Sequence, residues 1–311
     1  MAKYTIGTVI YENRIRKKIT QEELSYGICT PATLSKIENG MQMPRRKIFE
    51  ALMQRLGLQT QYYFLPLSSE DMERSNLEYQ ITRKLSLREY DFADLLDRYK
   101  SCGPKMDHME KQFYTYASAL LLLGSRSQME RGTELLLSAI LYTIPEFSVQ
   151  NVKKCALLTF LEITIINNIA INYRKLGHME EAKKMLLYLK EYLESKDIDL
   201  EEKAKIYPMI LFNLSNWFGR EGRNELVYEL CNMGIDFCIK HGKLTMFPML
   251  IFNKAYSLAK MNRLDEAIPY FRQACTIFEA LKDNERANLC RKEIQESFLN
   301  ACPDTIYIPR Y

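Results

Sequence analysis

The chain has 311 residues, of which 47% are hydrophobic and 26% charged, a length that allows two domains or one extended array. Glycine (12) and proline (10) are scarce, no apolar run could span a bilayer, and the start lacks a signal-peptide core, which predicts a helical, cytoplasmic protein without membrane contact. Residues 1–66 carry 10 Lys/Arg against 5 Asp/Glu, whereas the remainder carries 33 against 34. The positive excess therefore lies in the first 66 residues, as expected if that part binds a polyanion.

The cysteines and histidines give no sign of catalysis or metal binding. The eight cysteines are scattered without a C-x-x-C pair, and the three histidines are far apart in sequence. This spacing favours buried free thiols over disulfides or a zinc site. We therefore expect no enzyme, no cofactor and no metal.

The first elements in chain order are two helices with a clear start and stop. The segment "IGTVIYENRIRKK" has apolar residues at helical spacing and predicts the first helix. In "TQEEL", Thr20 is a good N-cap and Glu23 follows three residues later, which is a capping box. The second helix is short and is expected to end at Gly27.

The third and fourth helices follow directly. In "TPATLSKIENG", Thr30 is the expected N-cap and Gly40 the stop, with Leu34 and Ile37 facing inward. The outward face then holds Pro31, Ala32, Thr33, Ser35 and Lys36. The fourth helix is expected to begin at Pro44. Two short helices joined by a tight turn, with small and basic residues outward on the second, predict a helix-turn-helix.

The stretch "TQEELSYGICTPATLSKIENGMQMP" resembles the helix-turn-helix of lambda-repressor-like (Cro/C1-type) regulators over about 55 residues. Its turn, "SYGICT", is one residue shorter than in most of that family. The resemblance implies a DNA-binding domain at residues 1–66. It implies phosphate or base-edge contacts from a set of residues on and around the second and third helices, namely Gln21, Thr30, Pro31, Ala32, Thr33, Ser35, Lys36, Asn39, Arg45 and Arg46.

From residue 69 onward the sequence predicts helix pairs. The unit "NKAYSLAKMNRLDEAIPYFRQA" matches the tetratricopeptide pattern. The segment "NIAINYRKLGHMEEAKKMLLYL" repeats it, and "NLSNWFGREGRNELVYELCNMG" is a weaker third copy. More degenerate pairs lie around residues 77–100 and 106–141, and "DNERANLCRKEIQESFLN" is charged enough to cap the stack. We therefore predict an all-α chain in which about five hairpins form a right-handed solenoid over residues 69–302. Residues 303–311 form a tail of unassigned role.

A hydrophobic motif, called here the repeated phrase, occurs twice, as "YPMILFN" at 207–213 and "FPMLIFN" at 247–253. We expect it to open the first helix of two successive hairpins; whether each proline starts its helix or kinks a longer one stays open. The closing asparagines, with Asn168, fall at one position of three consecutive repeats. In tetratricopeptide domains this position lines the concave face. Amides there can both donate to and accept from a peptide backbone.

The order of a short-turn Cro-type domain followed by tetratricopeptide hairpins resembles the PlcR-type regulators of the Rap–Rgg–NprR–PlcR–PrgX group. That resemblance implies a cytoplasmic quorum-sensing regulator that binds a signalling peptide. It assigns backbone-holding amides to the concave face at Asn168, Asn213 and Asn253, with adjacent Asn167. One helical turn further on, Lys175, Arg220 and Lys260 are expected to line the same face, and Asn216 and Tyr256 complete the predicted peptide-binding set.

These patterns together predict a homodimeric transcription regulator of a two-fold symmetric duplex operator, controlled by a short oligopeptide. One alternative is an adaptor whose solenoid docks a partner protein. Another is a phosphorelay-directed activity, as in some relatives of the group, although no constellation of His, Asp and Glu supports it.

Overall fold

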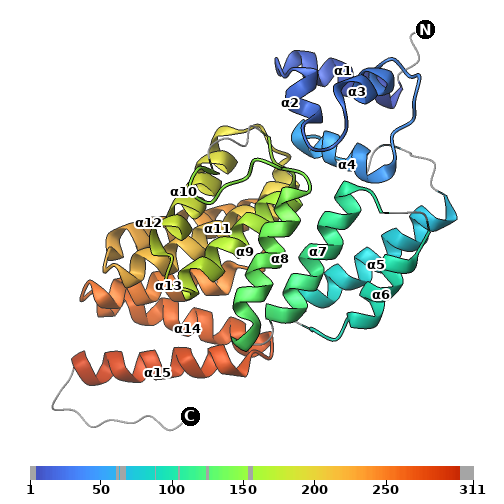
Figure 1. Ribbon diagram of the computed structural model, residues 1–311. Coiled ribbons are helices and arrows are strands. Elements are labelled where there is room, and N and C mark those ends of the chain that lie inside the picture. The colour runs from blue at the N-terminus through green and yellow to red at the C-terminus, as the bar shows by residue number, and fades with distance from the viewer. Residues whose placement is uncertain are drawn as a thin grey trace. The chain divides into compact units, whose positions relative to one another are not determined.

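The computed structural model describes residues 5–60, 63, 68–87, 89–103, 106–123, 126–152 and 157–301, and within these ranges the regular elements are helices alone (Figure 1). The tail at 303–311 lies outside the described residues. The contacts between residues divide the chain into two compact units, residues 1–199 and 200–311. None of the described helices is long and apolar enough to cross a membrane.

The first four helices form the predicted helix-turn-helix domain. Their bounds are Ile6–Arg16 (α1), Gln21–Ser25 (α2), Pro31–Glu38 (α3) and Arg46–Arg55 (α4). The expected capping box is present: the Thr20 hydroxyl accepts from the Glu23 N–H, and the Glu23 carboxylate accepts from the Thr20 N–H. A core of fully buried side chains holds the four helices together, including Ile10, Leu24, Leu34, Ile37 and Leu52. The short helices owe their stability to this packing, because helices of five to eight residues are not stable alone.

Two glycines end helices as expected. Gly27 follows α2 with φ +68°, and Gly40 follows α3 with φ +71°, a conformation that residues with a Cβ rarely adopt. Gly27 is also needed for close packing, since a Cβ there would overlap the carbonyl group of Thr143. The short turn is therefore in close contact with the backbone that follows the helix Met129–Leu141 (α8).

Three helical hairpins complete the first unit, and the sequence predicts each of these three helix pairs. The hairpins are Ser69–Ser86 with Ala93–Ser101 (α5, α6), His108–Leu123 with Met129–Leu141 (α7, α8), and Phe160–Lys175 with Met179–Ser195 (α9, α10), with a single 3-10 turn (η1) at Arg126–Gln128. The junction predicted near residue 69 is marked by a capping box in which Ser68 accepts from the N–H of Asp71. The predicted domain limits, 1–66 and 69–302, stay a prediction.

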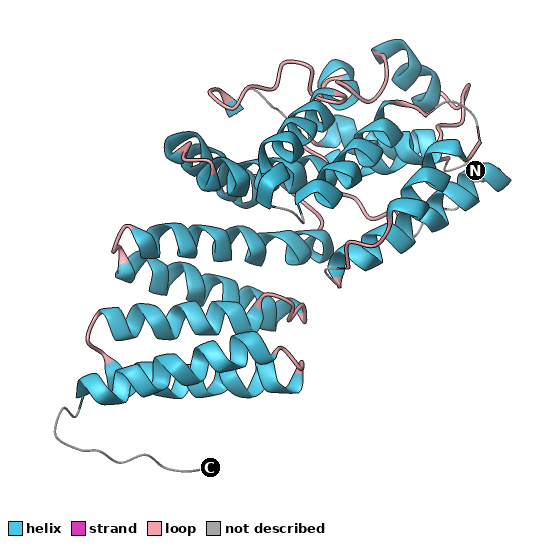
Figure 2. Ribbon diagram, turned by 60° about the horizontal axis from the view of Figure 1, so that its bottom comes forward, coloured by secondary structure: helices cyan, strands magenta, loops and turns pink. Residues whose placement is uncertain are grey.

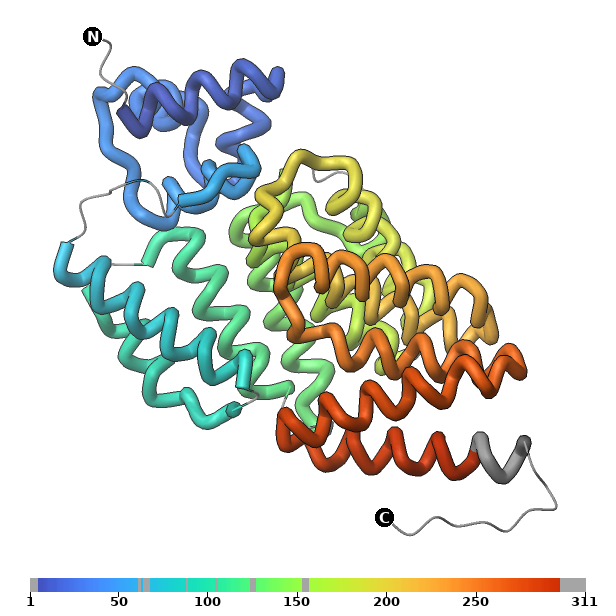
Figure 3. The backbone as a smooth tube through the Cα atoms, turned by 180° about the vertical axis from the view of Figure 1, so that it is seen from behind, coloured from blue at the N-terminus to red at the C-terminus, as the bar shows by residue number. Residues whose placement is uncertain are grey.

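The second unit consists of two hairpins and a further helix. Figures 2 and 3 show Leu200–Arg220 (α11), Asn224–His241 (α12), Phe247–Lys260 (α13), Leu264–Ala280 (α14) and Asn284–Ala301 (α15) as successive antiparallel helices. The small residues of the tetratricopeptide pattern, Ala255, Ala267 and Ala274, are fully buried, and so is Phe271. They let α13 and α14 pack closely, and the aromatic ring fills the space between the helices.

The repeated phrase occupies two different places in its two helices. Pro248 lies at the start of α13, but Pro208 lies inside α11, which begins at Leu200. The expectation that both copies form the first turn is therefore wrong for 207–213. The preceding "LEEKAKI" extends α11 because it consists of good helix formers with Glu201 and Glu202 in the first turn, where acidic residues are favoured.

Six cysteines fall within the described residues, and all are free thiols, as the sequence predicts. Cys231, Cys238 and Cys290 are fully buried. Burial raises the pKa of Cys238 to about 11, and those of Cys231 and Cys290 to about 12. Such thiols carry almost no thiolate near neutral pH, which fits a packing role.

Candidate functional sites

The outward face of α3 is open to solvent. Pro31, Ala32 and Lys36 are exposed, whereas Leu34 and Ile37 on the opposite face are buried in the domain core. Thr33 and Ser35 are half-buried beside them. The outward face of α3 thus presents the Lys36 amine, the hydroxyls of Thr33 and Ser35, and the apolar residues of its first turn. Groups of these kinds can contact base edges in a major groove.

The N-terminus of α3 is held by two threonines. The Thr30 hydroxyl accepts from the backbone N–H of Thr33 at 3.1 Å, and the two side-chain hydroxyls lie 2.9 Å apart. Pro31 occupies the first turn, where its missing N–H costs nothing. Thr30 therefore acts on α3 first as a cap, and its predicted contact with DNA stays a prediction.

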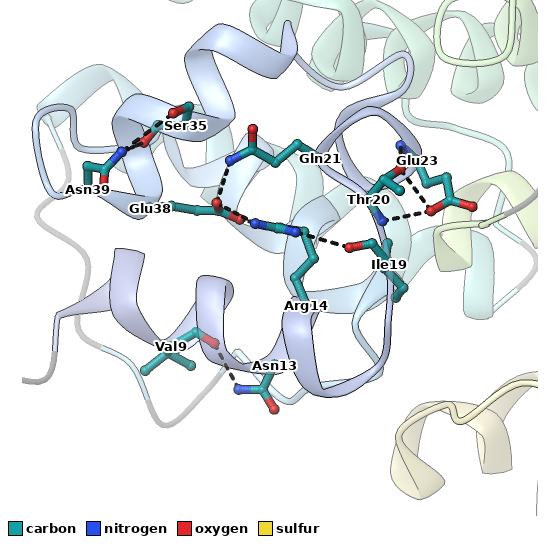
Figure 4. A network of polar contacts seen from close by, with 10 residues as sticks. All are labelled: Val9, Asn13, Arg14, Ile19, Thr20, Gln21, Glu23, Ser35, Glu38 and Asn39. Atoms are coloured by element: carbon teal, nitrogen blue, oxygen red, sulfur yellow. Dashed lines mark hydrogen bonds and ion pairs between the residues drawn. The ribbon is translucent and has the colours of Figure 1, made fainter.

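A buried ionic network behind α3 was missed by the sequence reasoning. Glu38 accepts two hydrogen bonds from the Arg14 guanidinium, at 2.6 and 2.9 Å, and one from the Gln21 side-chain amide at 2.6 Å (Figure 4). Arg14 also donates to the carbonyl oxygen of Ile19 at 3.1 Å. Arg14 is 6% exposed and Glu38 9%. The network joins α1, α2 and α3, so it fixes α3 relative to the rest of the domain.

This network also defines the position of Gln21, one of the predicted phosphate contacts. Its amide nitrogen is oriented by Glu38, and the side chain is half-buried at the start of α2. One N–H of the amide remains for a phosphate oxygen. The "IENG" stretch contains a signal that could have identified Glu38. A carboxylate next to the inward-facing Ile37 would repel the DNA phosphates if it faced them, which indicates a partner inside the domain.

The remaining predicted DNA contacts differ in their availability. Asn39 and Arg45 are exposed, and the Asn39 amide donates to the carbonyl oxygen of Ser35 at 2.9 Å. Arg46 donates to Glu50 at 2.6 Å within α4. Because that pairing offsets part of its charge, Arg46 is expected to contribute less to phosphate binding than Arg45.

The predicted peptide-binding residues of the first unit lie along α9. Asn168 is half-buried and its side chain hydrogen-bonds the Tyr116 hydroxyl on α7, whereas Asn167 is 1% exposed. Lys175 is exposed in the last turn, where a cation also interacts favourably with the helix dipole. Asn168 thus joins the first helices of two successive hairpins.

The second unit repeats this arrangement on α11 and α13. The Asn253 amide donates to the Ser215 hydroxyl at 2.8 Å and to the Asn216 side-chain oxygen at 3.0 Å. Asn213 and Asn216 are half-buried on α11. The structure therefore brings the side chains of Asn253 and Asn216 into contact. The sequence analysis placed both residues in the predicted peptide-binding set but predicted no contact between them.

Two cations of the predicted groove occupy corresponding helix ends. Lys260 lies in the last turn of α13 with its amine 5.1 Å from the centroid of the Tyr256 ring, and Arg220 is exposed in the last turn of α11. Asn168 belongs to one compact unit, while Asn213 and Asn253 belong to the other. A single column of amides across all three hairpins therefore stays a prediction.

The described residues were also compared with the composition of metal sites. Within the described ranges, no group of three or more His, Cys, Asp or Glu residues is arranged to hold a metal ion. The face of α3 and the polar residues along α9, α11 and α13 stay the predicted binding features.

Comparison with known proteins agrees with both parts of the chain. Residues 10–63 match the model of a helix-turn-helix family, and residues 250–281 match that of the tetratricopeptide repeat. No curated protein sequence matches the chain.

Solved structures with a similar fold span nearly the whole chain. One is Bacillus thuringiensis PlcR in complex with the peptide PapR7 and DNA, with a TM-score of 0.59 and 16% identity, covering 92% of this chain and 98% of PlcR. PlcR in its apo form gives 0.57 and 14%, covering 93% and 98%. ComR from S. thermophilus, in complex with DNA and its signalling peptide, gives 0.50 and 13%, covering 95% and 100%. At these identities the likeness concerns the fold, and on that ground this is an all-α chain of PlcR-type architecture, with a helix-turn-helix domain followed by tetratricopeptide-type hairpins.

Proposed function

We propose that this protein is a sequence-specific DNA-binding transcription regulator of the cytoplasm whose activity is controlled by a short peptide bound to the repeat hairpins. The observation that carries the proposal is the exposed face of α3, with Lys36 open to solvent in a domain that holds the positive excess of the chain. Similar folds in complexes with DNA and signalling peptides support it. The helix-turn-helix match and the similar folds support a regulator rather than an enzyme.

The proposed regulator acts as a homodimer on a two-fold symmetric operator. One helix-turn-helix domain reads only a few base pairs, so two of them are needed for useful specificity. The test is selection of duplexes by the full-length chain from a random-sequence pool. We expect an inverted repeat with half-sites about one helical turn, or a multiple of it, apart. Selection of no motif would contradict sequence-specific binding, and a single half-site would contradict the homodimer.

The asparagines provide the test of peptide binding. Asn213→Ala and Asn253→Ala are each expected to weaken binding of a synthetic oligopeptide, identified from a library with the wild-type chain, by about 1–3 kcal/mol, or about five- to a hundred-fold. Isothermal titration measures this loss. Selection of duplex DNA should survive, because residues 1–66 are unchanged.

The contacts of Asn253 sharpen this experiment. Since its amide bridges to Ser215 and Asn216, Asn253→Ala also removes a link between α13 and α11. Thermal unfolding of the same variants separates the two roles. Reduced stability with unchanged peptide affinity would mean that the amide is architectural, and the adaptor alternative would then gain support.

A further inference from the structure

The C-terminal end of α4 connects the helix-turn-helix domain to the repeat hairpins through one buried guanidinium. Arg55 is 4% exposed. One of its terminal nitrogens donates to the carbonyl oxygens of Leu24 and Tyr26, at the end of α2, and the other donates to the Glu162 carboxylate at 3.2 Å. A single side chain thus touches both the turn that precedes α3 and the first turn of α9.

Glu162 is held from its other side by α9 itself. Its side chain is fully buried, and its second oxygen accepts from the backbone N–H of Thr159 at 2.6 Å in a capping box. The helix-turn-helix domain supplies a further cap, because the Gln54 side-chain oxygen accepts from the Phe160 N–H at 3.1 Å. The first turn of α9 is therefore completed by residues of α4.

The turn itself leaves little room for independent movement. Gly27 packs on the backbone of Thr143, and Gly57, just after α4, packs in the same way on the backbone of Asp197. Cys29, in the same turn, is half-buried; burial raises its pKa to about 11, and the nearby Arg55 charge opposes that rise. Separating the buried Arg55–Glu162 pair would leave an uncompensated charge in the interior. The turn after α2 and the first turn of α9 are therefore expected to move together.

We propose that Arg55 is a positioning residue that couples the first turn of α9 to the turn before the recognition helix. The functional consequence of this coupling rests on the proposed function. Because α9 carries Asn167, Asn168 and Lys175, a peptide that shifts α9 would also shift α3 through Arg55. The coupling itself is a property of the free chain. It can be measured without any ligand.

The experiment is hydrogen exchange of the full-length chain, followed by mass spectrometry of peptides covering residues 24–30 and 160–163. Arg55→Lys keeps the charge but loses the rigid fork that reaches both partners. We expect it to speed exchange about tenfold or more in both segments. Glu162→Gln should also speed exchange at 24–30, although it lies in α9. In the Arg55→Lys background, Glu162→Gln should add nothing at 24–30, because the link is already broken.

Arg46→Lys is the matched control, since it alters an arginine of α4 whose carboxylate partner, Glu50, lies in the same helix. It should change neither segment. Additive effects of the two substitutions, or acceleration confined to the mutated segment, would overturn the coupling.

A second variant covers the case in which a single substitution unfolds the chain. Arg55→Met combined with Glu162→Met replaces the buried pair with apolar chains of similar length, which proteins often tolerate. Circular dichroism should show a folded protein, and iodoacetamide should modify Cys29 at least tenfold faster than in the wild type. An unchanged Cys29 rate in the folded variant would refute the proposal.

Binding to the duplexes of a random-sequence pool, and to any sequence enriched from it by the wild-type chain, is measured alongside by fluorescence anisotropy. Arg55→Lys should bind within about twofold of the wild type, since the face of α3 is unaltered. A wild-type chain that fails to bind DNA would contradict the proposed function but would leave the exchange result standing. The two hypotheses can therefore fail separately.

Discussion

Glu38→Ala is expected to destabilise the helix-turn-helix domain by about 3–5 kcal/mol, because it removes the carboxylate that pairs with the buried Arg14 guanidinium and the Gln21 amide. The cost comes from the positive charge left behind in a site that is 6% exposed. Urea denaturation followed by circular dichroism measures the loss, and hydrogen exchange in α3 assigns it to this domain. DNA binding should fall with the folded fraction.

Glu50→Ala is the control for this substitution. It also removes the carboxylate of an arginine pair, but the Arg46–Glu50 pair is partly exposed, with 27% and 23% of the side chains accessible. Its loss should cost less than about 1 kcal/mol. Arg14→Met combined with Glu38→Leu should recover much of the stability, since no buried charge then remains. A Glu38→Ala effect as small as that of Glu50→Ala would show that the network does not hold α3 in place.

Duplex DNA binding should weaken steeply with salt. If Lys36, Arg45 and Arg46 each neutralise one phosphate, the slope of log K against log salt is about −2.7 per domain, or about a 40-fold loss between 50 and 200 mM salt. Fluorescence anisotropy with one duplex over this range provides the slope. Arg45→Ala should reduce its magnitude by about 0.9, and Arg46→Ala by less, because Arg46 is already paired.

Lys36→Ala should also relax the preference for one base pair, by about 1–3 kcal/mol if the amine contacts a base edge. Lys184, an exposed lysine of α10, serves as the control, and Lys184→Ala should leave the slope unchanged. A flat salt dependence of the wild type would contradict the phosphate contacts. An unaltered sequence preference in Lys36→Ala would remove Lys36 from base reading.

The sequence by itself determined the features that depend on neighbours a few residues apart. The caps at Thr20 and Thr30 and the stops at Gly27 and Gly40 depend on local interactions. All the residues that make these interactions lie within a few positions of one another in the sequence. The pairing of helices into hairpins followed from the small residues of the repeat pattern. The outward face of α3 followed from its inward-facing Leu34 and Ile37.

Only the tertiary structure decided which polar groups meet across the fold. Arg55 and Glu162 are 107 residues apart in sequence, and Asn253 and Asn216 are 37 apart. Pairs of this kind exist only once helices have packed, and no periodicity distinguishes a buried glutamate such as Glu38 from a solvated one. The position of Pro208 inside α11 was equally hidden, because the helix-forming residues before it outweigh the tendency of proline to begin a helix.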